Sequence, residues 1–542
     1  MPDAPLRMRD PVTFEVVRSA LYATCEEMKS VMTRAAFSPL LSLSADLSCA
    51  LLDARGEVVA QGNDIPVHLG SMPFTAAGIL RKFPAEEWLP GDAVLMNDPF
   101  AGGNHLPDMT LMSAIFAGDG GGPGLVGFAA SRVHWPDVGG VSPGSSAVTD
   151  HVIKEGVRVP PVRIMRGYRV EQGILDLLLA NVRVPGDRMG DFSAQVACNA
   201  RGAARVSELV ARYGAATLAA VMRETLDYSE ALVGEALAGL RDGTYRASAL
   251  LDGDGYSQSA DAAGRDAFRL AVAVEKVGRR LSVDFAGTSP AVRGPVNAPI
   301  AVTSSACYYV LLAVAGGHVP PNAGAYRPMR IRAPEGSLVH ARYPSPVVAA
   351  NTETSNRLAD LLLAALAPAL GDRAVAGSYG CGAVYTLAGI DPARGASFVH
   401  YETVGGGMGA SSRGPGLGGF RVHMGNTMNL PIEAMEAQMP VRFEAYGLRP
   451  GSGGGGRHAG GEGVLKSIRA LADGVEFSVT AERALQPAPG IAGGGAGAAA
   501  RFSVARADGS IATLASKTPS ARLDRGDVLV IETAGGGGWG IA

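Results

Sequence analysis

The stretch NDPFAGGNHLPDMTLMSAIF fills positions 97–116, and LVGFAASRVH follows it at 125–134. Residues 109–116 and residues 125–134 both have the apolar character of β-strands. Between them lies AGDGGGPG, from Ala117 to Gly124, and so many glycines in succession are typical of a loop. The sequence therefore predicts a β-hairpin, with a rigid loop of glycine and proline leading into its first strand.

The register of this hairpin decides which side chains meet at its open end. If Phe116 pairs with Leu125, then Asp108 faces Val133 and lies beside His134. Opposed residues on neighbouring strands have Cβ atoms about 4.5–5.5 Å apart, a distance that a divalent ion can bridge. A slip of one residue would instead turn one of these side chains to the other face of the sheet.

His105 precedes Asp108 by three residues, so His105, Asp108 and His134 are candidate ligands of one metal ion. Two neutral imidazoles and a carboxylate suit Zn²⁺, Mn²⁺ or Fe²⁺ and leave coordination positions open for water. Such an open site lowers the pKa of bound water and supplies hydroxide near neutral pH. The alternative is structural: His105 holds a turn, Asp108 caps a strand, and His134 is an ordinary half-buried imidazole.

Three other polar residues near these ligands have more than one interpretation. Asp46 leads into a predicted strand at 47–52, and Asp137 follows His134 by three residues. Either acid is a candidate fourth ligand, a partner for an imidazole N–H, or a turn residue. His68, in VHLGSM after a proline, is interpreted as a structural histidine.

Helix and strand patterns alternate along the chain. Asp10-Pro11 predicts the start of a helix, and apolar residues then recur at steps of three and four up to Met32. Further helices are expected at 171–180, 192–212, 215–240, 303–315 and 355–370, and further strands at 47–52, 57–61, 92–96, 268–274 and 281–285.

These patterns predict an α+β fold, as a large, multi-layered and β-rich chain. Three regions are expected: an N-terminal metal-bearing α/β region (1–243), a central α+β region (244–370) and a C-terminal glycine-rich β region (371–542). The glycine runs of the last region are interpreted as tight turns between strands.

The composition excludes several classes of protein. Of the 542 residues 73 are glycine, yet 47% are hydrophobic, which is too many for a disordered chain. The 48 basic and 51 acidic residues nearly balance, and because no basic cluster occurs, nucleic acid is not an expected partner. Neither a signal peptide nor a membrane span is predicted, so we expect a cytoplasmic protein. Since only 18% of the residues are charged, a sizeable subunit interface is also expected.

Motifs along the whole chain resemble those of the hydantoinase B/oxoprolinase family. That family includes B subunits of ATP-dependent N-methylhydantoinase and caprolactamase, the C-terminal half of 5-oxoprolinase, and subunits of acetone and acetophenone carboxylases. The matching stretches are DPVTFEVVRSAL (10–21), SADLSCALLDARGEVVAQ (44–61), IPVHLGSM (65–72), NDPFAGGNHLPDMTL (97–111), HWPDVGG (134–140), GDFSAQVACNARG (190–202), PVNAP (295–299), ETVGGGMGA (402–410), NLPIEAMEAQMPVR (429–442), GSGGGGRHAGGEGV (451–464) and AGGGGWG (534–540).

The resemblance implies a metal site in this chain. In related subunits the ligands fall in an H-x-x-D loop, in a later H-x-x-D-[VI]-G-G segment and at the aspartate of S-x-D-[FL]-S. The corresponding residues here are His105, Asp108, His134 and Asp46. Asp137 is then the candidate catalytic residue, as a proton acceptor or as the group that orients His134. Trp135-Pro136 stands where relatives often have His-Ala, so one neighbouring histidine is missing.

The resemblance also implies a hetero-oligomer. ATP is expected to bind to a partner, a hydantoinase A-type ATPase subunit, which agrees with the absence of a G-x-x-x-x-G-K-[ST] loop here. The partner would phosphorylate the substrate, and this chain would hydrolyse a cyclic amide of the hydantoin, 5-oxoproline or lactam type. Two alternatives stay open: carboxylation of a phosphorylated ketone, as in acetone and acetophenone carboxylases, and a scaffold without catalytic activity.

Overall fold

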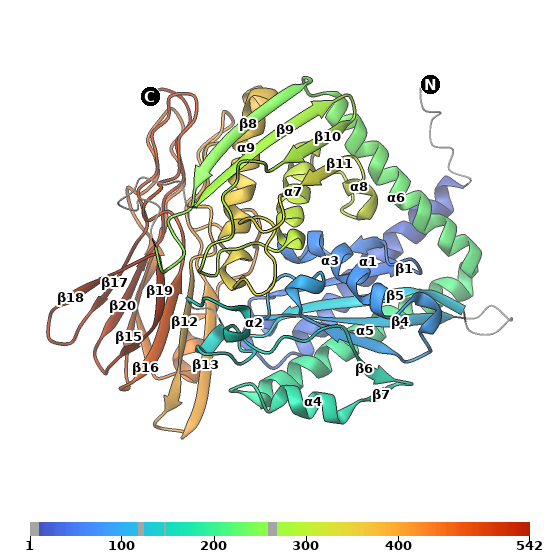
Figure 1. Cartoon of the computed structure of the whole chain (residues 1–542), viewed down its shortest axis with the longest axis horizontal. Coiled ribbons are helices and arrows are strands. Elements are labelled where there is room, and N and C mark those ends of the chain that lie inside the picture. The colour runs from blue at the N-terminus through green and yellow to red at the C-terminus, as the bar shows by residue number, and fades with distance from the viewer. Residues whose placement is uncertain (1–9, 118–123, 146–147, 258–267) are drawn as a thin grey trace.

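The computed structural model describes residues 10–117, 124–145, 148–257 and 268–542. Most of the expected hairpin loop, residues 118–123, lies outside these ranges. The fold is α+β, as expected: helices and four sheets form several layers, and the C-terminal sheets stand together at one end of the molecule (Figure 1). No helix within the described ranges is both long enough and apolar enough to cross a membrane.

The N-terminal sheet has seven strands in the order β2-β1-β5-β4-β3-β6-β7. Their bounds are Leu47–Asp53 (β1), Val58–Gln61 (β2), Ala93–Met96 (β3), Asp108–Ala117 (β4), Gly124–His134 (β5), Val162–Arg166 (β6) and Arg169–Val170 (β7). Strands β4 and β5 form the predicted antiparallel hairpin in the middle of this sheet.

Helices cover both faces of the seven-stranded sheet. Leu51 of β1 belongs to the core that contains α1 (Pro11–Ala35) and α5 (Pro185–Tyr213), whereas the next residue, Leu52, packs in the core of α3 (Pro66–Lys82). This alternation follows because successive side chains of a strand point to opposite faces. The hairpin that carries the candidate ligands therefore lies in the middle layer of three.

Helix α1 begins where the sequence predicts. The carboxylate of Asp10 accepts hydrogen bonds from the backbone N–H groups of Val12 and Thr13, at 3.1 and 3.3 Å. It thereby satisfies two amides that have no partner in the first helical turn. The apolar residues at steps of three and four, from Phe14 to Met32, are buried.

The central region contains a four-stranded sheet in the order β11-β10-β9-β8. Its strands are Gly243–Leu250 (β8), Arg269–Val277 (β9), Arg280–Asp284 (β10) and Met329–Arg332 (β11). The other helices of the chain are Pro39–Ser42 (α2), Gln172–Leu179 (α4), Ala215–Ala238 (α6), Ile300–Ala315 (α7), Ala323–Tyr326 (α8), Thr354–Leu370 (α9) and Ile432–Gln438 (α10).

Most of the predicted long helices agree with these bounds within a few residues, but two helices differ. Helix α5 begins at Pro185, well before the expected start at residue 192. Helix α3 was not expected, because Pro73 and two glycines inside it are atypical of helix interiors. Val233 and Leu237 of α6 pack in the core of the central region, so the expected boundary at residue 243 stays a prediction.

Two further sheets form the C-terminal region, with strand orders β13-β12-β16-β19 and β14-β15-β20-β17-β18. The strands are Val384–Asp391 (β12), Ala396–Thr403 (β13), Val441–Leu448 (β14), Val464–Ala470 (β15), Val475–Thr480 (β16), Arg501–Ala505 (β17), Ile511–Leu514 (β18), Lys517–Leu523 (β19) and Val528–Glu532 (β20).

Glycine-rich segments that are far apart in the sequence run side by side in this region. The N–H of Gly536 donates to the carbonyl of Gly461 at 2.9 Å, and the N–H of Gly461 donates to the carbonyl of Met408 at 2.8 Å. A Cβ on Gly536 would lie 2.1 Å from the Met408 oxygen, and a Cβ on Gly460 would lie 2.0 Å from the Gly536 oxygen. Backbone therefore packs directly on backbone, which the interpretation as simple turns did not include. We call segments 405–409, 453–461, 490–497 and 535–538 the glycine bundle.

Candidate metal centre

A β-bulge sets the register at the metal-site end of the hairpin. Phe116 pairs with Leu125, as the sequence predicts, but the register shifts by one residue just before this pair. Asp108 therefore pairs with His134, and the expectation that it would face Val133 was wrong by one residue. A bulge places one extra residue in one of the two strands, and no sequence pattern here marks its position.

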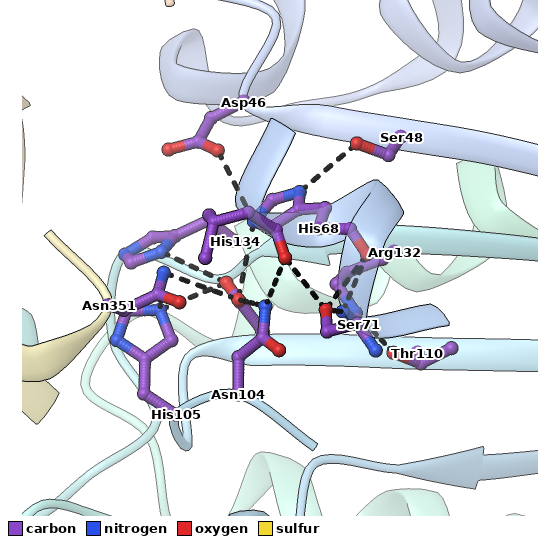
Figure 2. Close-up of polar contacts among 12 residues, drawn as sticks. Asp46, Ser48, His68, Ser71, Asn104, His105, Thr110, Arg132, His134 and Asn351 are labelled. Atoms are coloured by element: carbon purple, nitrogen blue, oxygen red, sulfur yellow. Dashed lines mark hydrogen bonds and ion pairs between the residues drawn. The ribbon is translucent and has the colours of Figure 1, made fainter. Parts of the chain in front are cut away.

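His105, Asp108 and His134 lie together in the interior of the protein. Nε2 of His105 is 3.0 Å from Oδ1 of Asp108, and Nδ1 of His134 is 3.4 Å from the same oxygen. One ligand-type atom from each residue lies within 4.8 Å of the other two, and each residue is at most 2% exposed. Figure 2 shows the two imidazoles turned toward one point from different segments.

The hydrogen bonds of His105 leave a lone pair facing the carboxylate. Its Nδ1 lies 3.1 Å from the carbonyl oxygen of Val348, an acceptor only, so Nδ1 carries the hydrogen. In the neutral ring Nε2 then directs its lone pair at Asp108, and two electron-rich atoms repel unless a proton or a metal ion lies between them. Nε2 of His134 is also buried, with no hydrogen-bond partner among the described residues. This donor set fits a divalent metal ion.

The pKa values of Asp108, His105 and His134 reflect both their burial and their closeness to one another. Burial opposes charge on Asp108, but His105 and His68 outweigh it and hold the pKa of the carboxyl well below its usual value. Burial also opposes charge on His105, yet Asp108 raises the pKa of that imidazole. Burial dominates at His134 and lowers its pKa. These shifts favour an ionised Asp108 and a neutral His134, the forms in which these two residues bind metals.

His68 is a third imidazole on the same carboxylate, although the sequence had suggested a structural role. Its Nε2 lies 3.2 Å from Oδ2 of Asp108, and its Nδ1 lies 3.2 Å from Oγ of Ser48. No local pattern indicated this contact, because helix α3 meets the hairpin only through packing. The available signal was the motif IPVHLGSM, which matches the family around this histidine.

Two buried amides complete the surroundings of Asp108. Nδ2 of Asn104 donates to Oδ2 of Asp108 at 3.1 Å. Nδ2 of Asn351 lies 3.2 Å from Nε2 of His105 and 3.4 Å from Oδ2 of Asp108. Asn351 comes from the segment before α9, so the central region also contributes to the site (Figure 2).

Arg132 holds helix α3 against the hairpin. From β5 its guanidinium donates to the carbonyl oxygen of His68 at 3.1 Å and to Oγ of Ser71 at 2.5 Å. Burial lowers the pKa of Arg132 to about 10, so the group stays charged near neutral pH. These bonds fix the turn of α3 that presents His68 to Asp108.

Asp46 lies beside the close group formed by His105, Asp108 and His134, but it is not part of that group. Its carbonyl oxygen accepts a hydrogen bond from the N–H of His134 at 3.1 Å, because β1 begins at the next residue and pairs with β5. Its carboxylate Oδ1 is 3.9 Å from Nε2 of His68. The structure thus brings Asp46 next to the candidate ligands, and its part in metal binding stays a prediction.

The carboxylate of Asp137 accepts hydrogen bonds from Arg183. Its Oδ1 accepts from Nη1 of Arg183 at 2.7 Å, and its Oδ2 accepts from the backbone N–H of Arg183 at 2.8 Å. These bonds tie the segment after β5 to the segment before α5. The catalytic role expected for Asp137 stays a prediction.

Two of the candidate ligands, Asp46 and His134, line a small cavity of about 20 Å³ together with His68 and Tyr401. A water molecule needs roughly 10–15 Å³ of such space, so the cavity holds about one. The ring of Tyr401 lies against His134, with centroids 4.3 Å apart and the rings tilted by 31°. Tyr401 also lines a second cavity of about 240 Å³. A ligand larger than one water fits this cavity only if its walls move.

Known proteins share both the sequence and the fold of this chain. The chain is 33% identical to 5-oxoprolinase 1 of Arabidopsis thaliana over 98% of its own length, and it spans 42% of that relative. It is 30% identical to the putative D-/L-hydantoinase B subunit of Pseudomonas sp. (strain NS671), covering 99% of this chain and 90% of that one.

Two solved structures have the same fold. The ATP-dependent caprolactamase of Pseudomonas jessenii superposes with a TM-score of 0.90 at 27% identity, over 98% of this chain and 92% of that chain. Acetone carboxylase superposes with a TM-score of 0.88 at 18% identity, over 99% of this chain and 77% of that chain, a likeness of fold alone. The sequence model of hydantoinase B/oxoprolinase matches residues 10–542, which include every candidate ligand described above. The chain therefore belongs to the hydantoinase B/oxoprolinase family.

Proposed function

We propose that this chain is the cytoplasmic, metal-dependent B subunit of an ATP-dependent amidohydrolase. Its substrate would be a cyclic amide of the hydantoin, 5-oxoproline or lactam type, phosphorylated first by an A-type ATPase partner. The observation that carries the proposal is the buried group of His105, Asp108 and His134. Relatives named as a hydantoinase B subunit, 5-oxoprolinase and caprolactamase support the substrate class.

The residues that would hold the metal are His105, Asp108 and His134, with Asp46 as the fourth. Imidazole and carboxylate together suit Zn²⁺, Mn²⁺ or Fe²⁺. When bound, such an ion polarises a substrate oxygen and lowers the pKa of water.

Phosphorylation answers the main difficulty of the reaction, which is that an amide carbon is a poor electrophile. In the O-phosphorylated imidate, one water adds its oxygen to the ring carbon and a proton to the nitrogen. The C–N bond then breaks, the hydroxyl proton passes to the amine, and an acyl phosphate remains. A second water hydrolyses the acyl phosphate to a carboxylic acid and phosphate, so atoms balance over the two steps.

The chain's own residues orient the reacting groups and keep excess water out. His68 and Asn104 hold Oδ2 of Asp108, while the Val348 carbonyl holds the ring of His105. The cavity has space for about one water, and Tyr401 separates it from the larger cavity. This arrangement limits unproductive hydrolysis of a phosphorylated substrate.

The test is to co-express this chain with its A-type partner and measure ATP hydrolysis that depends on hydantoins, 5-oxoproline or lactams. Asp108→Ala and His134→Ala should lose bound metal and ring opening together. His318→Ala, which removes an exposed histidine, is the matched control and should keep both. Full activity in both site variants would contradict the site assignment, and incorporation of labelled bicarbonate into a ketone would favour carboxylation instead.

A further inference from the structure

Arg421 lines the same small cavity as Asp46, His68 and His134. It is the cationic side chain that lines this cavity, beside the carboxylate of Asp46. Arg421 lies in the segment between β13 and α10, so it belongs, like Tyr401, to the C-terminal region.

Among the described residues, the hydrogen bonds of the Arg421 guanidinium all come from one nitrogen, Nη1. Nη1 donates to the carbonyl of Gly382 at 2.7 Å and lies 3.3 Å from the hydroxyl of Tyr379 and 3.5 Å from the carbonyl of Val404. Nε is buried without a hydrogen-bond partner among the described residues. An unpaired buried donor costs free energy, so it indicates a missing acceptor.

The space beside the unused edge is kept open by a glycine. A Cβ at Gly425 would lie 2.5 Å from Nη2 of Arg421, and Gly425 also lines the cavity. The Nε and Nη2 edge of an arginine is the planar fork that binds two oxygens of one anion. The glycine therefore leaves this edge uncovered at the cavity wall, and the cavity of about 20 Å³ must widen for a phosphoryl group to reach it.

Three arginines that are more deeply buried than Arg421 each contact oxygen atoms of the protein. Arg188 lies 3.1 Å from Asp191, and Arg483 lies 2.6 Å from Asp360. Arg132 donates from Nε, Nη1 and Nη2 to hydroxyl and carbonyl oxygens. No carboxylate lies within ion-pair distance of Arg421 among the described residues, and, unlike Arg132, Arg421 leaves its Nε without an acceptor there.

We propose that the Nε and Nη2 edge of Arg421 binds the phosphoryl group of the activated substrate. The inference rests on the proposed function, because there the phosphoryl oxygen is bonded to the reacting carbon and must lie close to the metal ligands. A carboxylate elsewhere on the substrate offers the same oxyanion chemistry, but it would lie farther from that carbon. Arg421 thus selects an O-phosphorylated substrate and neutralises the phosphate as the C–N bond breaks.

Equilibrium binding of inorganic phosphate to the metal-loaded chain tests the proposal without any enzymatic assay. Arg421→Gln should weaken phosphate binding about 10-fold or more, the size expected for lost charge-assisted hydrogen bonds. The phosphate affinity of Arg421→Lys should lie between those of the wild type and Arg421→Gln. Metal content should not change. Arg413→Gln removes an exposed arginine eight positions earlier and should bind phosphate like the wild type. Unchanged phosphate affinity in Arg421→Gln would overturn the proposal.

A second arm separates the two sources of the oxyanion and the two proposals. If acetate binds as tightly as phosphate, and Arg421→Gln raises KM only for substrates with a carboxylate, the phosphoryl assignment is wrong. If the wild-type complex opens no cyclic amide but phosphate binding still depends on Arg421, the proposed function fails while the anion site stands. If the complex is active and Arg421→Gln keeps its kcat and phosphate affinity, only the role of Arg421 fails.

Discussion

Nε2 of His68 lies 3.2 Å from Oδ2 of Asp108, so a helix that the sequence did not reveal contributes directly to the candidate metal centre. Oγ of Ser48 lies 3.2 Å from Nδ1, the other ring nitrogen of His68. The carboxylate that joins His105 and His134 is therefore also held by the helix that covers this face of the sheet.

His68→Ala should weaken metal binding about 10- to 100-fold, the usual effect of removing a group that orients a metal ligand. The reason is that Oδ2 of Asp108 would lose one of its donors and the carboxylate could rotate. Metal titration of the apo chain measures this effect. Ser48→Ala is the milder companion variant, since it leaves the imidazole in place. Wild-type metal affinity in His68→Ala would mean that Asn104 and Asn351 alone hold the carboxylate.

Asp137→Asn and Arg183→Gln should each destabilise the protein by about 1–3 kcal/mol, because each breaks a pair in which the carboxylate is buried. Arg183 is 31% exposed, so the loss should lie below that of a fully buried ion pair. The double variant should lose less than the sum of the two single variants. Denaturation and kcat are measured together, and a fall in kcat with unchanged stability would instead support proton transfer by Asp137.

Ionisation of Glu155 should make the folded protein less stable at alkaline pH. Its carboxylate accepts from the N–H groups of Val347 and Val348, at 2.8 and 3.0 Å, and burial raises its pKa from the usual 4.5 to about 8. Because the folded-state pKa is raised, this contribution to stability is complete below the unfolded pKa and is lost as pH rises through the folded pKa.

Melting temperatures of the wild type and of Glu155→Gln, measured from about pH 5 to about pH 9 so that the range spans the raised pKa, check this expectation. The difference should shift in favour of the glutamine variant as pH rises from the usual pKa of 4.5 toward about 8, and it should level off above that. Glu86→Gln, which alters an exposed glutamate, should follow the wild type at every pH. Parallel melting curves for all three proteins would exclude Glu155 as the source of the pH dependence.

Gly536→Ala should destabilise the protein by about 1–3 kcal/mol or more, because the new Cβ would lie 2.1 Å from the carbonyl oxygen of Met408. Gly455→Ala is the matched control within the glycine bundle, since a Cβ there meets no atom within 4 Å. It should change stability by no more than about 0.5 kcal/mol. Chemical denaturation of both variants measures the difference, and equal losses would argue against the backbone contact as the cause.

The local parts of the fold and site were accessible from the sequence, and the parts made by packing were not. Asp10 and Pro11 mark a helix start through bonds within four residues, and the hairpin follows from two strands and one loop. The bulge in β5 shifted the pairing of Asp108 by one residue, because bulges have no strong sequence signal. His68 and Asn351 reach the site from other elements, and such contacts depend on tertiary packing.

The glycine bundle has a consequence for how its substitutions can be rescued. In a core of side chains, a residue that is too large is often accommodated by a smaller neighbour, because total volume is what the core must keep. Around Gly536 and Gly460 the neighbours are carbonyl groups of the main chain. No substitution makes a main-chain carbonyl smaller. Genetic screens should therefore recover few intragenic suppressors of substitutions there, whereas defects in the side-chain cores should be suppressed readily.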